Sequence, residues 1–133
     1  MRLTACLGVP LDVIEPCGFP LSDKAVRRAA MDYGGKADLA RHASWSAFRA
    51  AAAPGRLVLF TTKGANSLYS FTFRADDVLL FGSESAGVPD EVHEAADARL
   101  IIPIRAETRS LNLVTAAAIG LSEALRQIAA FPA

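Results

Sequence analysis

The sequence predicts a single α/β domain built on a parallel sheet with helices on both faces. Three short apolar segments, Leu57–Thr61, Val78–Phe81 and Leu100–Ile104, alternate with segments of helical pattern. These segments are apolar at consecutive positions, which is typical of parallel strands that are buried on both sides. The chain has 133 residues, so we expect one domain over residues 1–133.

The first part of the chain predicts a helix end, a strand and a second helix. Arg2 to Gly8 is typical of the last turns of a helix, with Gly8 just past its end. Leu11–Ile14 is strand-like and stops before a proline. A helix is predicted from about Asp23 to Tyr33, with Ser22 as its cap.

Three further helices follow. Ser44 is expected to cap a helix that runs through Ala53, and Pro89 to begin a short helix over Asp90–Ala96. The longest helix is predicted over Leu111–Phe131 and is apolar on more sides than a lone surface helix needs. That pattern favours burial against a partner.

Composition, residue spacing and the absence of targeting patterns limit the partners, metal sites and location that can be expected. Hydrophobic residues make up 52% and charged residues 21%, and the formal net charge is zero, so any contact with nucleic acid needs a local basic patch. Cys6 and Cys17, like His42 and His93, lack the spacing of metal ligands, and no metal site is predicted. Without a signal peptide or an uninterrupted apolar span, the chain is expected in the cytoplasm.

Ligands of parallel α/β sheets bind beyond the carboxyl ends of the strands, which directs attention to three loops. The loop after Thr61 contains Lys63-Gly64, which is either an anion contact or an ordinary turn. The loop from Gly82 to Pro89 has neither P-loop nor dinucleotide spacing, and a glycine-rich surface turn is the alternative. In the third loop, Ser110 or Asn112 is expected to cap the last helix, and that helix start also suits a ligand oxygen.

Two of these loops carry motifs that resemble the SPOUT class of RNA methyltransferases. Leu80 to Pro89 reads LFGSESAGVP and resembles the second motif of that class, a strand followed by F-G-x-E-x-x-G-x-P. Ile102-Pro103 followed by Arg109 to Leu113, RSLNL, resembles the third motif. The stretches Ile14–Phe19 and Met31–Tyr33 resemble the small, single-domain members that methylate the 2′-hydroxyl of the tRNA wobble nucleotide.

The resemblance implies a fold, a cofactor and partners. The fold is a parallel α/β sheet with a C-terminal deep trefoil knot, and the enzyme is a homodimer that methylates cytidine or uridine of tRNA with S-adenosylmethionine. Carried over by position, the cofactor contacts fall on Phe60, Gly82, Ile102 and Ser110.

The resemblance is incomplete at the start of the chain. Arg2 falls on the arginine of the first motif, N-x-G-x-x-x-R, and is the candidate catalytic residue, while the Asn, the Gly and the first strand have no counterpart. We expect roughly 15–20 further residues ahead of Arg2 in the natural gene, including an apolar strand. Two alternatives stay open: an inactive RNA- or cofactor-binding remnant of the same fold, and a generic flavodoxin-like nucleotide-binding module.

Overall fold

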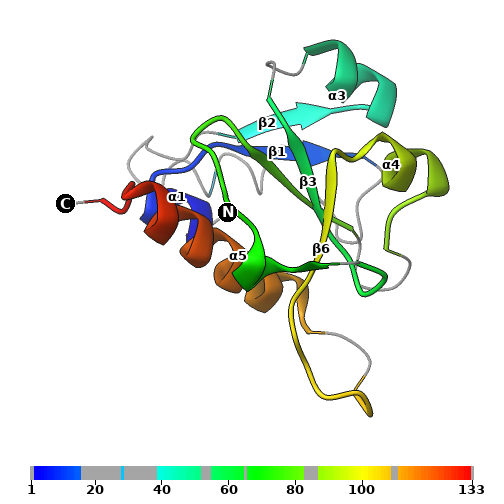
Figure 1. The fold of residues 1–133 in the computed structure, drawn as a ribbon. Coiled ribbons are helices and arrows are strands. Elements are labelled where there is room, and N and C mark those ends of the chain that lie inside the picture. Colours follow the sequence, from blue (N-terminus) through cyan, green and yellow to red (C-terminus); the bar gives the residue numbers. More distant parts are fainter. Residues whose placement is uncertain are drawn as a thin grey trace. The chain divides into compact units, whose positions relative to one another are not determined.

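The computed structural model describes residues 2–15, 28, 39–51, 55–64, 66–82, 87–108 and 111–132. These residues belong to two compact units. The first comprises Met1–Ala53 with Pro132–Ala133, and the second comprises Pro54–Phe131 (Figure 1).

The described part of the first unit contains a small parallel sheet and the helices α1 and α3. Helix α1 (Arg2–Leu7) ends at Gly8, as predicted, and Gly8 has a φ of 67°. The amide groups of Gly8 and Val9 donate to the carbonyl oxygens of Ala5 and Thr4, which closes the helix end. Strand β1 (Leu11–Ile14) has the predicted bounds.

Strand β1 pairs with β2 (Leu39–His42), a strand that the sequence analysis did not predict. Strand β2 is short and half of its residues are polar, so only its pairing identifies it. Two side-chain contacts reinforce this pairing: Asp12 Oδ1 lies 2.7 Å from His42 Nε2, and Arg41 donates to Oε1 of Glu15, just past β1, at 2.9 Å.

Helix α3 (Trp45–Ala51) follows, and the Ser44 hydroxyl accepts from the Ala47 amide at 3.1 Å, as expected of its cap. The helix predicted over Asp23–Tyr33 lies outside the described residues, apart from Arg28, which is helical and exposed.

The second unit contains a four-stranded sheet in which every described pairing is parallel. Strands β4 (Asn66–Ser67), β6 (Ala98–Ile101), β3 (Leu57–Phe60) and β5 (Val78–Phe81) lie in the order β4-β6-β3-β5. All four residues of β3 are buried, so both faces of this central strand are covered. The predicted parallel α/β architecture is confirmed.

One predicted strand was misplaced. The strand expected over Leu100–Ile104 is β6, which begins at Ala98 and ends at Ile101. Asp97 sets this start, because its amide donates to the Leu57 carbonyl oxygen and its carboxylate accepts from the Leu57 amide. The run of branched apolar residues begins only at Leu100, so the sequence pattern does not reveal a start that hydrogen bonds set.

The helices of this unit differ only at their ends from the predicted ones. Helix α4 (Asp90–Ala95) has Pro89 as its N-terminal cap. Helix α5 (Leu113–Ile128) is shorter at both ends than predicted, and Asn112 caps it by accepting from the amides of Val114 and Thr115. A 3-10 turn, η1 (Leu68–Ser70), was not predicted.

The core of the second unit lies between the sheet and α5. It is formed by buried residues of β3, η1, the segment after η1, β6 and α5, namely Val58, Phe60, Leu68, Phe73, Leu100 and Ala124. Helix α5 contacts both β5 and η1. One face of the sheet is therefore covered by the last helix of the chain.

A first polar clamp joins the amino ends of β3 and β5. Arg56 donates to both carboxylate oxygens of Asp77, at 2.8 and 2.7 Å, and to the Thr72 carbonyl oxygen. Burial alone would raise the pKa of Asp77, but hydrogen bonds from Arg56 and from the Arg74 amide hold that pKa below its ordinary value. The pair therefore stays ionised and fixes both strands where they begin.

A second polar clamp joins α5 to the segment after η1. The Gln127 side chain accepts from the Phe73 amide and donates to the Phe71 carbonyl oxygen, each at 2.8 Å, and it also donates to Glu123. Arg126 donates twice to the same glutamate. These bonds hold the pKa of Glu123 at about 2, with that from Arg126 contributing most.

Candidate active site at the carboxyl ends of the strands

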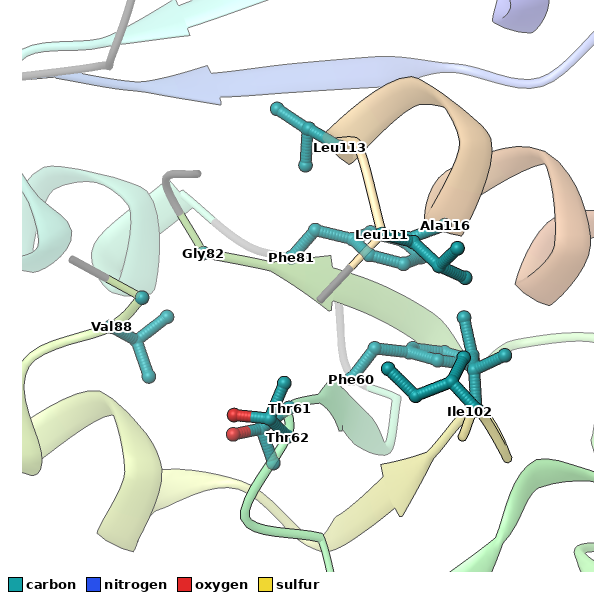
Figure 2. Close-up of a pocket in the computed structure, with 12 residues that line it drawn as sticks. Phe60, Thr61, Thr62, Phe81, Gly82, Val88, Ile102, Leu111, Leu113 and Ala116 are labelled. Carbon is teal, nitrogen blue, oxygen red and sulfur yellow. The ribbon is translucent and has the colours of Figure 1, made fainter. Parts of the chain in front are cut away.

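A pocket of about 150 Å³ opens where β3, β5 and β6 end and α5 begins (Figure 2). Its lining comes from the strand ends, the segments that follow them and the first turns of α5: Phe60, Thr61, Thr62, Phe81, Gly82, Gly87, Val88, Ile102, Ile104, Leu111, Leu113 and Ala116. A cavity of this volume accepts a group about the size of one aromatic ring. The position agrees with the general rule for parallel α/β sheets.

The structure brings three of the predicted site residues together. Phe60 ends β3, Gly82 follows β5, Ile102 follows β6, and all three line the pocket. Ser110 lies outside the described residues. Arg2 lies in the first unit, on α1, where it is exposed.

Two stacked aromatic rings form part of the pocket wall. The ring centroids of Phe60 and Phe81 are 4.8 Å apart and the rings are inclined by 15°. They are partners in the parallel register of β3 and β5, so their side chains leave the same face of the sheet. Figure 2 shows both side chains extending in the same direction, beside Leu111 and Ile102.

Helix α5 reaches this pair of rings through a glycine. A Cβ atom at Gly120 would lie 2.8 and 2.9 Å from two ring carbons of Phe60 and 3.3 Å from one of Phe81. Real Cβ atoms essentially never approach other atoms to less than 3.0 Å. Gly120 was not among the predicted site residues, because a glycine within a helical pattern gives no sign of what packs on it.

Gly82 meets a steric constraint that the sequence did not reveal, besides the predicted approach of a ligand to its main chain. In the structure, a Cβ atom there would lie 2.5 Å from the carbonyl carbon of Gly87. The space is filled by the other end of the same loop, and Gly87 is itself held at a φ of 67°.

The polar side chains among the described lining residues carry hydroxyl groups and no charge. The described lining residues include no ionisable side chain. Thr61 and Thr62 supply hydroxyl oxygens, which point toward the side on which Val88 lies (Figure 2). Thr61 Oγ1 also accepts from the Lys63 amide at 3.2 Å. Such a pocket binds by shape, apolar contact and neutral hydrogen bonds.

Sequence reasoning missed part of the pocket. Val88, Leu113 and Ala116 line it, but none was singled out. Leu113 and Ala116 lie one turn apart at the start of α5, and that spacing was the available signal.

The fold and the pocket define a class: parallel α/β proteins with a ligand pocket at the carboxyl edge of the sheet. Comparison with known proteins then gives the family. The chain matches the SpoU rRNA Methylase family over residues 1–122, and it belongs to that family.

Two similar proteins are named tRNA (cytidine(34)-2′-O)-methyltransferase. The protein from Beijerinckia indica is 55% identical over 132 residues, which cover 98% of this chain and 82% of the relative. The protein from Ancylobacter novellus is 52% identical, with coverage of 98% and 84%.

Two solved structures are also similar. One was described as giving insights into the 2-OH methylation of C/U34 on tRNA; it has a TM-score of 0.85, 43% identity and coverage of 96% and 84%. The other is the SpoU methyltransferase AviRb from Streptomyces viridochromogenes with AdoMet bound. Its TM-score is 0.77 and its identity 29%, with coverage of 96% of this chain and 53% of AviRb.

Two further findings concern membranes and metals. In the described part of the chain, no helix has the length and apolar character needed to cross a membrane. The described residues also hold no group of three or more His, Cys, Asp or Glu side chains placed to bind a metal ion.

Proposed function

We propose that this protein transfers a methyl group from S-adenosylmethionine to the ribose 2′-hydroxyl of the tRNA wobble nucleotide, cytidine or uridine 34. The observation that carries the proposal is the apolar pocket at the ends of β3, β5 and β6 in a chain of the SpoU family. The names of the similar proteins support the tRNA substrate and the position of the nucleotide.

The lining of the pocket fits such a cofactor. The rings of Phe60 and Phe81 and the side chains of Ile102 and Leu111 offer flat and apolar surfaces suited to a purine ring. The hydroxyls of Thr61 and Thr62 suit polar atoms of the remainder. We assign the cofactor contacts to Phe60, Gly82, Ile102 and Ser110, of which Ser110 shortly precedes α5 in the sequence.

The cofactor and the protein contribute different parts of the reaction. The cofactor supplies the activated methyl group, so no metal is required. The protein aligns the ribose oxygen with that group and assists the loss of the hydroxyl proton. No described lining residue is ionisable, so the residue that assists this loss is not one of them.

Arg2 is our candidate for the catalytic contact. A guanidinium group only donates hydrogen bonds, so Arg2 suits orientation of the 2′-oxygen and of a neighbouring phosphate better than proton removal.

The proposal includes finer features of the fold and assembly. These are a single domain over residues 1–133, helices on both faces of the sheet, a C-terminal deep trefoil knot, a homodimer and a cytoplasmic location. Exposed apolar side chains support the homodimer: Val114 on the first turn of α5 is 61% exposed and Phe131 is 47% exposed. Light scattering at micromolar concentration tests the dimer, and a stable monomer contradicts it.

The decisive experiment measures methyl transfer from radiolabelled S-adenosylmethionine to a tRNA transcript, followed by nucleoside analysis. We expect 2′-O-methylcytidine or 2′-O-methyluridine at position 34. The matched control is the same tRNA with a 2′-deoxynucleotide at that position, which lacks the acceptor. A ribosomal RNA fragment tests the other substrate class that the family name suggests.

Each outcome has one interpretation. Transfer to ribosomal RNA and not to tRNA contradicts the proposed substrate. Binding of S-adenosylhomocysteine without transfer to any RNA favours the inactive remnant. The absence of both binding and transfer contradicts the proposal as a whole.

A further inference from the structure

One position of α5 that packs against the pocket wall carries no side chain. Gly120 is buried on the sixteen-residue helix, which covers the sheet beside β5. Glycine inside a helix is unfavourable by about 1 kcal/mol relative to alanine. A helix that retains glycine at a buried position therefore indicates close packing.

The packing partner is the ring of Phe60. Phe60 is 7% exposed, so its ring is enclosed by neighbours and has little room to move. A methyl group on Gly120 would approach two of its ring carbons to less than 3.0 Å. The main chain of β3 is fixed by parallel partners on both sides, so the ring and not the strand must move.

The ring has few directions in which to move. Phe81 is stacked on Phe60, with the rings inclined by 15°, and it would itself lie 3.3 Å from the new methyl group. Both rings line the pocket together with Ala116, which lies one turn before Gly120 on the same helix. A displaced ring therefore changes the volume of the pocket.

We propose that Gly120 is a positioning residue: by carrying no side chain, it holds the Phe60–Phe81 pair in the orientation that shapes the pocket. The residue touches neither the cofactor nor the substrate and acts through Phe60. The inference rests on the proposed function in taking S-adenosylmethionine as the occupant. The sizes of the side chains at positions 60 and 120 are then complementary, and a larger residue at one requires a smaller residue at the other.

The test is a double-mutant cycle with Gly120→Ala, Phe60→Leu and the combined variant. Calorimetry measures the affinity for S-adenosylhomocysteine, and thermal unfolding measures stability. Gly120→Ala is expected to weaken binding about tenfold, because crowding in a packed core typically displaces neighbours. Its melting temperature is expected to fall little, because alanine favours the helix.

The combined variant is expected to lose less affinity than the sum of the two single losses, because leucine at position 60 vacates the space that the methyl group needs. Ser122→Ala, an exposed substitution on the same helix, is the control and should bind as the unmodified protein does. A Gly120→Ala variant with unchanged affinity overturns the inference, as does strict additivity of the two substitutions.

A readout without ligand separates this inference from the proposed function. Stacked rings shift each other's proton resonances, so Gly120→Ala is expected to move the ring signals of Phe60 and Phe81 in nuclear magnetic resonance spectra. If the unmodified protein does not bind S-adenosylhomocysteine, the choice of cofactor is wrong. If it binds and neither the ring signals nor the affinity change in the variant, the role of Gly120 is wrong.

Discussion

Gly82 and Gly87 approach each other so closely that a Cβ atom on Gly82 would lie 2.5 Å from the carbonyl carbon of Gly87. The two glycines are the described ends of the loop that follows β5. The loop is therefore closed by contact between two main chains, and Gly82 is required by the loop itself before any ligand arrives.

Replacement of Gly82 by alanine is expected to displace the Gly87 main chain. The affinity for S-adenosylhomocysteine should fall at least about tenfold, and the free energy of unfolding by about 1–3 kcal/mol, the usual range for overpacking. Calorimetry and chemical denaturation measure the two effects. Ser122→Ala, an exposed substitution on α5, is the control. A variant with normal stability that has lost only binding would favour direct contact between Gly82 and the ligand.

Replacement of Gln127 is expected to lower the stability of the protein more than replacement of most other polar residues of α5. Gln127→Ala removes the partners of the Phe73 amide and the Phe71 carbonyl oxygen, and it should cost about 1–3 kcal/mol of unfolding free energy. Urea denaturation measures this cost, with Ser122→Ala as the control. A cost near zero would mean that water replaces the side chain at both main-chain groups.

Replacement of Ala129 by glycine is expected to stabilise the protein. Ala129 ends α5 with a φ of 55°, a left-handed conformation that costs an alanine about 1 kcal/mol more than a glycine. Chemical denaturation should show a gain of about that size. Ala130→Gly serves as the control, because Ala130 does not have a positive φ, and it should not stabilise. Equal effects of the two substitutions would contradict the argument.

Glu123 is expected to make stability sensitive to acid. Its pKa is lowered from 4.5 to about 2, so the contribution of its ionised form is complete above about pH 4.5 and is lost as the pH falls toward 2. The unfolding free energy of Glu123→Gln should therefore fall less steeply over this interval. Asp77, whose pKa is also lowered, contributes to the slope that remains. Parallel curves for the two proteins would show that the glutamate is not stabilised by folding.

The sequence predicted most elements, because consecutive apolar positions and helix caps are local signals. Strands β1 and β5 have the predicted bounds, and Asn112 caps α5 as one of two expected residues. Strand β2 and the start of β6 depend on hydrogen bonds to residues distant in the sequence, Asp97 with Leu57 among them, and no local pattern reveals such pairings.

The site was predictable to a similar extent. The rule that ligands bind beyond the carboxyl ends of parallel strands selected three loops. The resemblance to the SPOUT class then indicated Phe60, Gly82 and Ile102, and these three residues line one pocket. Their assignment as cofactor contacts stays a prediction. Gly120 was not predictable, because its role depends on the distance between a helix and an aromatic ring.

The strand order β4-β6-β3-β5 has a consequence for the rate of folding. No described strand of this sheet pairs with its neighbour in the sequence, so no hairpin can form early and guide the rest. Long stretches of chain separate strand β3 from its two partners. Closing these stretches costs conformational entropy before the paired strands stabilise the sheet. We expect refolding over milliseconds or longer, measured by stopped-flow circular dichroism. A chain that returns to the native signal within microseconds would have a nucleus of local contacts in α5 instead.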